Sequence, residues 1–459
     1  MKKHAATYTA ILRTLAPFAV SACTASAALA QPLEPIQILQ PADAAATNLF
    51  GFSAMELVDG KLYVSAPNRL NGGTSGTGAV YVYDADTLTL LSTITASNAP
   101  PVPEPFRFGR ALAIEGDRLL VSSREADPTN PDREGAAYLM QVSTGAQLDR
   151  YTPPTFRDLP SPDFGESVAL AGDIAVVGDP NAARSNPAIR DGVATFFDIP
   201  TGQQEALLGG SVVTYDTGFG VAMASNEGGV YIVGESANGV NLYDPETRQI
   251  LDTLSPNTGG SFAGSDIAIF GDVLAVSDSN VFPGEFVASA VYLFDLTTNE
   301  LLRTVQFDPD PGDLGLGRFI ALNDQYLLAT RFLPGTFSFE LSVLVFDAAT
   351  GDLLTEIQAP VGSESRFGGA LALNGNLAYI GSGPNDVFPL PGGAVLVYDL
   401  SQLEACAADT NGDGQLTPAD FNAWVLAFNA QAPECDQNGD SLCDPSDFNA
   451  WVINFNAGC

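Results

Sequence analysis

The sequence predicts an all-β domain followed by a small α-helical one, and three observations support this prediction. A unit of four short alternating strands recurs along most of the chain. The cysteines beyond residue 30 all lie close to the C-terminus, at Cys406, Cys435, Cys443 and Cys459. The same C-terminal segment carries two copies of one acidic loop, each followed by an apolar helical pattern. We therefore predict a seven-bladed β-propeller over residues 31–403 and a small helical domain over residues 404–459.

The first thirty residues have the composition of a secretory signal peptide. Lys2, Lys3 and Arg13 give a basic start, an apolar stretch follows, and Ala28-Leu29-Ala30 offers a small-x-small cleavage site. We expect residues 1–30 to be removed and the mature protein to be secreted, either into the medium or onto the cell surface.

An alternative reading of this segment stays open. Val20-Ser21-Ala22-Cys23 resembles a lipoprotein cleavage box, which would leave a lipid anchor on Cys23. The apolar stretch itself is too short to predict a membrane-spanning helix, and no longer one follows.

Charge and histidine content restrict the chemistry. The chain has 54 acidic and 19 basic residues and a formal net charge of −35, so we expect neither nucleic acid nor anionic membrane as a partner. Its one histidine, His4, lies in the predicted signal peptide. The mature chain therefore lacks the means for Ser-His-Asp or Cys-His catalysis and for His-ligated zinc or iron. We nominate no catalytic residue.

The repeated unit predicts a propeller blade. Each unit opens with an aromatic-glycine step and an alternating strand, turns tightly into a second strand, and crosses a polar loop to a strongly alternating third strand and a short fourth one. The openings recur about every 50 residues. They are Phe50, Phe108, Phe164, Phe219, Phe262, Leu316 and Phe367. Period-2 alternation without a helical stretch favours blades over a solenoid.

The two ends of the repeat predict how the ring closes. The last unit ends at residues 393–400 without a fourth strand, and an unassigned strand, Pro35–Leu39, precedes the first opening. We expect that strand to complete the last blade, which removes an open sheet edge.

The remaining repeat features have structural interpretations. We expect Asp-x-x-Thr turns such as Asp347–Gly351 to cap their own hairpins, and the aromatic-glycine steps to pack blades rather than bind ligands. Polar loops at residues 68–77, 124–134 and 180–191 should line one rim, where they are candidate contact surfaces for carbohydrate or protein.

The openings and the GAVYVYD-type strands resemble FG-GAP repeat propellers, the family to which the integrin α head belongs, over roughly residues 36–400. Many members hold calcium in a DxDxDG-type loop within a blade. The matching turns here, such as Val58-Asp59-Gly60, are too short and too poor in acids for that, so the resemblance does not extend to calcium in the blades.

Two acidic loops near the C-terminus predict two calcium ions. The first reads DTNGDGQLTPAD from Asp409, and the second reads DQNGDSLCDPSD from Asp436. A twelve-residue loop supplies oxygen ligands to Ca²⁺ from positions 1, 3, 5, 7, 9 and 12. In the first loop these are Asp409, Asn411, Asp413, the carbonyl of Gln415, Thr417 and Asp420. In the second they are Asp436, Asn438, Asp440, the carbonyl of Leu442, Asp444 and Asp447.

The loops and their helices resemble the dockerin family. Each loop has Asp rather than Glu at position 12 and precedes nearly the same helix, FNAWVLAFN from Phe421 and FNAWVINFN from Phe448. The resemblance covers residues 406–459 and is closest to a variant that ends in Gly-Cys, as this chain does. It implies calcium loops and docking onto a cohesin-like partner in the envelope or outside the cell.

The same resemblance implies which residues contact the partner. Dockerins place recognition residues at loop positions 10 and 11, here Pro418 with Ala419 and Pro445 with Ser446. These pairs differ from the Ser-Thr type of cellulosomal dockerins. The helical spacing favours packing of Trp424 and Trp451 between the two helices, and either one, if exposed, would be a candidate partner contact.

The four C-terminal cysteines allow three disulfide connectivities. We expect Cys406–Cys459 to join the ends of the domain and Cys435–Cys443 to brace one loop. At this size the domain should depend on disulfides and calcium for much of its stability.

Two classes of function follow from these patterns. The first is a non-enzymatic secreted propeller, a binding or scaffold protein that the C-terminal domain attaches to an extracellular or envelope partner. The alternative is a polysaccharide-active hydrolase or lyase carrying a dockerin, or a carbohydrate-binding propeller. Carboxylate pairs catalyse such hydrolysis without histidine, but no motif singles out a pair here.

Overall fold

The computed structural model describes most of the chain in two compact units, one within Leu33–Ala405 and the other within Cys406–Gly458. The described residues are 33–43, 49–69, 77–96, 107–126, 134–154, 163–182, 192–209, 218–233, 239–256, 264–278, 290–306, 315–334, 339–360, 367–383, 392–403, 408–411, 416–438 and 442–457. The predicted signal peptide, with Cys23, lies outside them, as does the opening at Phe262.

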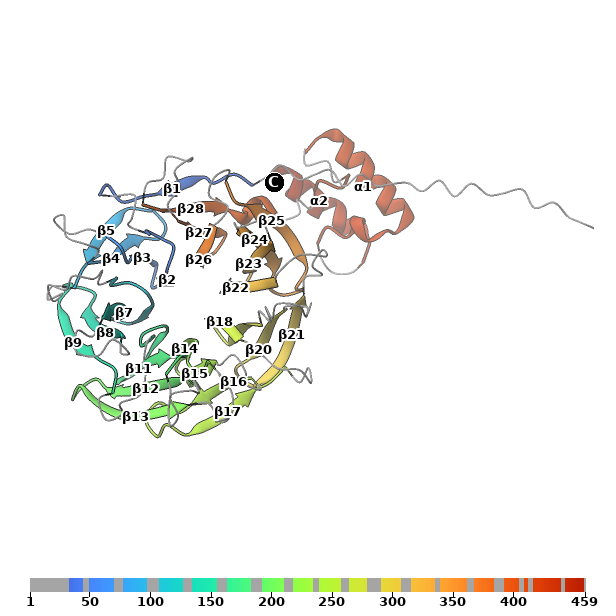
Figure 1. The fold of residues 1–459 in the computed structure, drawn as a ribbon. Helices are drawn as coiled ribbons and strands as arrows, with labels where there is room; N and C mark the ends of the chain where they lie inside the picture. Colours follow the sequence, from blue (N-terminus) through green and yellow to red (C-terminus); the bar gives the residue numbers. More distant parts are fainter. Residues whose placement is uncertain are drawn as a thin grey trace, which may run out of the picture. The chain divides into compact units, whose positions relative to one another are not determined.

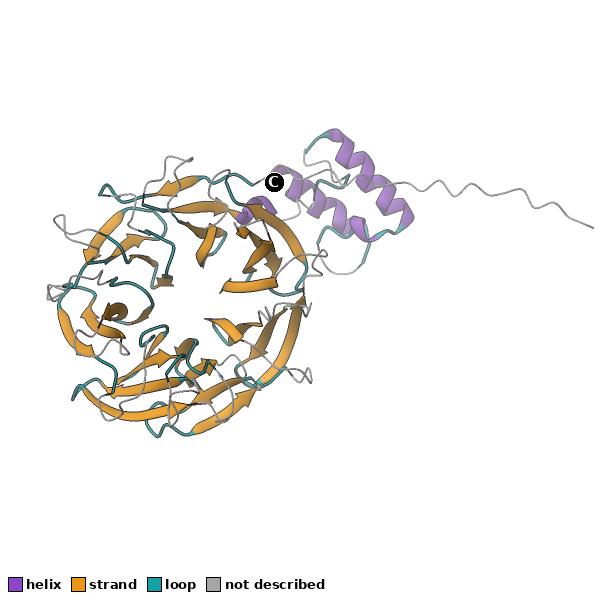
Figure 2. Cartoon of the chain, viewed as in Figure 1, coloured by secondary structure: helices purple, strands orange, loops and turns teal. Residues whose placement is uncertain are grey.

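The first unit is a seven-bladed β-propeller, as the repeat predicted (Figures 1 and 2). Its described residues form seven four-stranded antiparallel sheets, each with its first strand near the centre of the ring. Blades 1 to 3 are β2 (Met55–Val58), β3 (Lys61–Ala66), β4 (Ala79–Asp84) and β5 (Leu90–Ile94); β6 (Leu112–Glu115), β7 (Arg118–Ala126), β8 (Glu134–Gln141) and β9 (Gln147–Tyr151); and β10 (Val168–Ala171), β11 (Ile174–Asp179), β12 (Val193–Asp198) and β13 (Gln203–Gly209). Blades 4 to 6 are β14 (Ala222–Asn226), β15 (Gly229–Val233), β16 (Val240–Tyr243) and β17 (Ile250–Leu254); β18 (Gly264–Phe270), β19 (Val273–Asp278), β20 (Ala290–Asp295) and β21 (Glu300–Gln306); and β22 (Gly315–Leu322), β23 (Tyr326–Pro334), β24 (Phe339–Asp347) and β25 (Leu353–Gln358).

The seventh blade joins the two ends of the propeller and confirms the predicted closure. It consists of β26 (Phe367–Asn374), β27 (Leu377–Ser382) and β28 (Ala394–Asp399), with β1 (Gln37–Leu39) as its outermost strand. β1 pairs antiparallel with β28, and a short 3₁₀ helix, η2 (Leu400–Leu403), follows β28.

Alternation in the third strands supplies the core on both faces of a blade. In β4, Tyr81 and Tyr83 pack against blade 7, whereas Val80 and Val82 pack against blade 2. The described residues form seven such buried clusters, one between each pair of neighbouring blades. The middle strands are therefore buried on both faces, while the outermost strands, such as β5, are largely exposed. This explains why the second and third strands are the most apolar in each unit.

The aromatic-glycine step packs one blade against the next, as the sequence predicted. Each described opening side chain, including that of Leu316, is at most 1% exposed. The glycine that follows adopts a positive φ and lies against the preceding blade. A Cβ on Gly165 would lie 2.8 Å from Cβ of Ser122, and one on Gly51 would lie 2.7 Å from a methyl group of Val395. Both the backbone conformation and the lack of space therefore require glycine.

A second glycine, directly before or at the start of the third strand, completes this contact. Gly78 and Gly192 form isolated parallel bridges with Phe108 and Phe219 of the following blade. A Cβ on Gly135 would overlap the backbone carbonyl of Phe164. The chain of one blade thus touches the opening of the next through backbone atoms.

The Asp-x-x-Thr turns cap their own hairpins, as expected. The Thr87 N–H donates to Oδ1 of Asp84 over 2.8 Å, and the Thr350 N–H donates to Oδ1 of Asp347 over 2.6 Å. Hydrogen bonds from Thr87 lower the pKa of Asp84. These aspartates therefore have structural partners.

The three polar loops follow the second strand of blades 1, 2 and 3, so they leave the same end of the sheets. Most of each loop lies outside the described residues. Among the helices that the structure describes, none combines the length and the apolar character needed to cross a membrane.

We predict that Gly135→Ala destabilises the propeller far more than Gly145→Ala. Both glycines have a positive φ, 106° and 67°, but only the Cβ at residue 135 meets a neighbouring backbone, whereas that at residue 145 meets open space. Gly145→Ala should cost about 1–2 kcal/mol from backbone strain alone. Gly135→Ala should cost about 3 kcal/mol or more in addition, because a backbone carbonyl cannot rotate away as a side chain can. Urea-induced unfolding followed by circular dichroism measures the loss of stability in both variants. Equal losses would contradict a role of the close backbone contact at Gly135 in holding the blades together.

Candidate functional site

The described part of the second unit contains two helices, and each begins at position 10 of an acidic loop. They are α1 (Pro418–Ala430) and α2 (Pro445–Ala457), with a 3₁₀ turn, η3 (Pro433–Cys435), between them. Thr417 caps α1: its hydroxyl accepts from the N–H of Ala419 over 3.2 Å, and Asp420 completes a capping box. Asp444 plays the equivalent part for α2, accepting from the N–H of Ser446 over 2.7 Å. Residues at loop positions 9 and 12 therefore also start the helices.

The carboxylate at position 12 of the first loop points back into the loop. Asp420 is fully buried, and its Oδ2 accepts from the N–H of Thr417 over 2.7 Å, while its Oδ1 accepts from the N–H of Asn411 over 3.4 Å. Burial raises the pKa of Asp420, but these hydrogen bonds outweigh it and bring the pKa below its usual value. The group is thus held as a carboxylate at the centre of the loop.

The second loop repeats this arrangement. Asp447 is also fully buried. Its Oδ1 accepts from the N–H groups of Gln437 and Asn438 over 2.9 and 3.3 Å, and its Oδ2 accepts from the N–H of Asp444 over 2.7 Å. Two loops of different sequence therefore hold their last carboxylate in the same way.

The two tryptophans connect each helix to the other loop. The indole N–H of Trp424 in α1 donates to the carbonyl of Cys435, directly before the second loop, over 3.1 Å. The indole N–H of Trp451 in α2 donates to the carbonyl of Ala408, directly before the first loop, over 3.2 Å. Each half of the unit therefore holds the other through one indole hydrogen bond. The two tryptophans occupy equivalent positions in the two sequence copies, and so do the two carbonyls that accept from them.

The tryptophan side chains form the centre of the helical core. They are 5% and 6% exposed and pack with Ala408, and Val425, Phe428 and Phe455 lie against them. This confirms the packing interpretation. The condition for a partner contact, an exposed tryptophan, is not met by either indole.

The other predicted partner residues lie at the surface. Pro418, Ala419, Pro445 and Ser446 are all exposed at the starts of the two helices. Sequence reasoning did not single out Leu426 and Ile453, which are 71% and 66% exposed. Both residues occupy the same position in the two copies, two residues after the tryptophan and so on the opposite face of the helix. This spacing could have predicted their exposure.

One predicted disulfide is confirmed. The structure joins Cys435, directly before the second loop, to Cys443 at loop position 8, with a Cα–Cα distance of 5.7 Å. Cys406 and Cys459 lie outside the described residues, so their pairing stays a prediction.

The described loop residues fit a hard cation. Asp409, Asn411 and Thr417 with Asp420, and Asp436, Asn438 and Asp444 with Asp447, offer oxygen donors of the kind that Ca²⁺ prefers. Asp413, Gln415 and Asp440 lie outside the described residues. Among the residues that are described, no three acidic or cysteine side chains converge as a preformed metal cluster. The support that the structure gives to the predicted calcium sites is therefore the oxygen-rich set of side chains and the two carboxylates that point into the loops.

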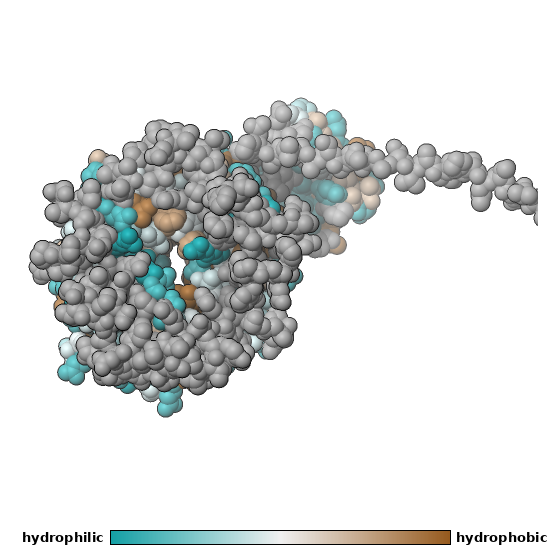
Figure 3. All heavy atoms as spheres, viewed as in Figure 1, coloured by the Kyte–Doolittle hydropathy of each residue, from teal (hydrophilic) through white to brown (hydrophobic). Residues whose placement is uncertain are grey.

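The propeller has a central hollow, around which side chains of the described residues are visible (Figure 3). Glu56 on β2 and Asp266 on β18 belong to innermost strands of different parts of the ring (Figure 1). Burial raises the pKa of Asp266 to about 7, against hydrogen bonds from the N–H groups of Ile320 and Ile267. The side chain of Glu56 is exposed, but its surroundings on an innermost strand desolvate it, and this desolvation and then the charge of Asp266 raise its pKa to about 8.

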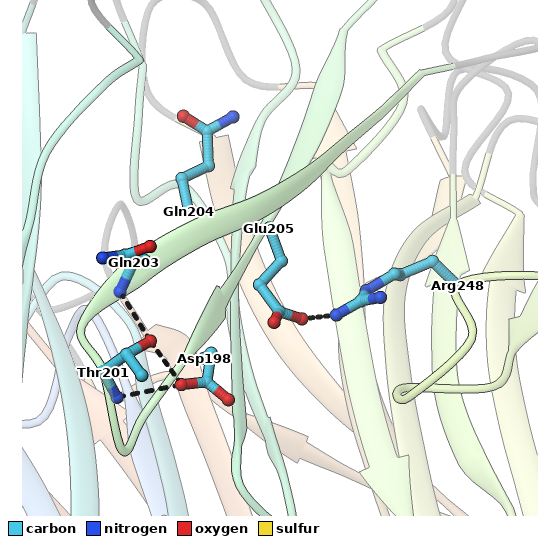
Figure 4. Close-up of a pocket in the computed structure, with 6 residues that line it drawn as sticks. All are labelled: Asp198, Thr201, Gln203, Gln204, Glu205 and Arg248. Atoms are coloured by element: carbon cyan, nitrogen blue, oxygen red, sulfur yellow. Dashed lines mark hydrogen bonds and ion pairs between the residues drawn. The ribbon is translucent and has the colours of Figure 1, made fainter.

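A shallow pocket of about 410 Å³ lies between the outer turns of blades 3 and 4 (Figure 4). The charged groups that line it have partners within the two hairpins: Asp198 accepts a hydrogen bond from the N–H of Thr201, and Glu205 forms an ion pair with Arg248. The pocket is therefore explained by the packing of two neighbouring hairpins, whose polar groups satisfy one another.

Comparison with models of known protein families gives no match to this chain, and comparison with curated protein sequences gives none either.

We predict that Glu56→Gln changes the pH dependence of stability. Because the pKa of Glu56 is raised in the folded state, from 4.5 to about 8, the folded protein binds the proton more tightly over that window. This contribution to the free energy of unfolding is complete below pH 4.5 and is lost as the pH rises through 8. The Gln variant should lose less stability than the parent protein between pH 5 and 9, measured as denaturation midpoints.

The matched control is Glu227→Gln, in the exposed turn between β14 and β15. It should follow the parent profile. A Glu56→Gln profile parallel to the parent would show that this carboxyl titrates as in the unfolded chain.

Proposed function

We propose that this chain is a secreted, non-enzymatic binding or scaffold protein, an FG-GAP-like propeller that a dockerin-like module attaches to an extracellular or envelope partner in a calcium-dependent manner. The observation that supports it most is the duplicated loop–helix unit, in which Asp420 and Asp447 are buried and turned into their loops. In the proposed site, each loop holds one Ca²⁺ through its oxygen side chains and a backbone carbonyl, and the ion supplies positive charge that balances the clustered carboxylates.

Docking is proposed on the exposed faces of α1 and α2. The residues at loop positions 10 and 11 are exposed, and Leu426 and Ile453 are the most exposed large apolar side chains of α1 and α2. Exposed apolar side chains in equivalent positions suit a protein partner more than a polysaccharide, because they offer no hydrogen bonds to sugar hydroxyls. The duplication gives the partner two similar faces.

We predict that CaCl₂ changes the intrinsic tryptophan fluorescence of the full mature chain and that Asp420→Ala and Asp447→Ala each remove one of two binding events. Both tryptophans of the chain, Trp424 and Trp451, lie in this module, so their emission reports on it alone. The variants lose a charged ligand at position 12, and the double variant should show no calcium response. MgCl₂ should act only weakly, and Glu227→Ala, which removes a carboxylate from the propeller surface, should bind like the parent. A double variant that still binds two ions would overturn the assignment of the loops.

Docking is tested separately, with the immobilised full chain and the secreted and envelope fractions of the source organism. We expect one protein to be retained in calcium, released by chelator, and absent when the Asp420→Ala/Asp447→Ala variant is immobilised. Calcium binding without any such capture would reduce the loops to structural elements and reject the docking role.

A further inference from the structure

A second pocket, of about 290 Å³, opens at the end of the propeller where the first polar loop leaves the sheet. It is lined by Leu49, Ser53, Pro67, Asn68, Arg107 and Arg110. The lining comes from the segments before β2 and before β6 and from the end of β3, so it joins blades 1 and 2. None of these six residues is acidic, although the chain carries 54 acidic and only 19 basic residues.

Arg107 is held in a costly conformation. It directly precedes the opening Phe108 and has a φ of 53°, as Leu49 does before Phe50. The equivalent residue before Phe219 is Gly218, with a φ of 55°. Arginine thus occupies a left-handed position that glycine fills at another blade without strain. Strain of this kind is common where a side chain must be aimed at a ligand.

Two polar atoms of the residues that line the pocket have no hydrogen-bond partner among the described residues. These atoms, Nε of Arg107 and Oδ1 of Asn68, are both buried. One is a donor that lacks an acceptor, and the other is an acceptor that lacks a donor. Leaving such groups unpaired is unfavourable, so a ligand that satisfies both gains affinity.

The two arginines differ in their charge balance. Arg110 is paired with two acids of blade 3, lying 3.6 Å from Asp163 and also contacting Glu166. Arg107 has no ion pair with any described residue. The positive charge available to a ligand is therefore that of Arg107.

We propose that this pocket binds a uronic acid residue at the end of an acidic oligosaccharide. The sugar carboxylate accepts hydrogen bonds from Arg107, and a ring hydroxyl donates to Oδ1 of Asn68, with the hydroxyl of Ser53 available beside them. A simple carboxylate such as acetate has no donor for Asn68, and a neutral sugar has no charge for Arg107. The volume is close to the lower end of small-molecule pockets, about 300 Å³, which suits one sugar ring. This proposal names a ligand for the propeller and does not depend on calcium binding by the C-terminal module.

The test is isothermal titration of the full mature chain with glucuronate and galacturonate, and with short oligosaccharides that carry them at the end. Glucose, galactose, acetate and an oligo-aspartate peptide serve as comparison ligands. We expect one saturable site for a uronate, at least tenfold weaker binding of the neutral sugars and of acetate, and weakening of the uronate complex by added NaCl. Acetate binding as tightly as the uronates would overturn the sugar assignment, and tighter binding of the peptide would replace it with an acidic protein ligand. No binding by any probe would reject the site.

Two variants test the role of Arg107. Arg107→Gln and Arg107→Gly should each weaken uronate binding at least tenfold. The glycine variant should also unfold at a higher denaturant concentration, because it relieves the left-handed strain. It therefore tests the site even if Gln at this position impairs folding.

Arg248→Gln is the matched control. Arg248 also has a left-handed φ, of 59°, and a buried Nε without a hydrogen-bond partner, but it is ion-paired with Glu205 in the other pocket. It should bind uronate like the parent. Unchanged affinity in the Arg107 variants, or equal loss in Arg248→Gln, would reject the assignment.

Discussion

The ring depends on backbone contact between neighbouring blades. At each described opening a large apolar side chain is buried, and at most of these contacts a glycine on one side, or on both, lets the two chains approach within van der Waals distance or closer than any Cβ would allow. The apolar clusters between blades contribute most of the stabilising area, but they set no unique distance. The glycine contacts fix that distance, and the alternating strands can then fill the remaining space.

This constraint decides where function can reside. Second and third strands are covered on both faces, and their turns at one end are closed by aspartate caps. What remains variable is the opposite end, where the polar loops leave, together with the central hollow. The pocket around Arg107 lies at this end, where the residues before two openings meet the segment that follows β3.

The propeller was predictable in considerable detail because its repeat carries redundant signals. The orphan strand at Pro35–Leu39 and the turn aspartates behave as the sequence indicated. Leu316 takes the place of an aromatic residue with the same burial, since the opening needs volume rather than a ring. The influence of the Asp266 charge on the pKa of Glu56 could not be predicted, because the two residues belong to different repeats and only the closed ring gives them innermost strands around one hollow. The same holds for Arg107, whose neighbours come from three separate segments.

The C-terminal unit shows the same division between what is local and what is not. The loop spacing could be derived from the sequence, whereas the reciprocal bonds of Trp424 and Trp451 could not, since each joins one copy to the other. Those bonds have a consequence for the proposed metal sites. Each indole holds the carbonyl directly before the first ligand of the opposite loop, so the start of one loop is positioned by the helix that the other loop begins. A unit with so small a core has few other means of positioning two loops, and reciprocal bracing makes each half of the duplication necessary to the other.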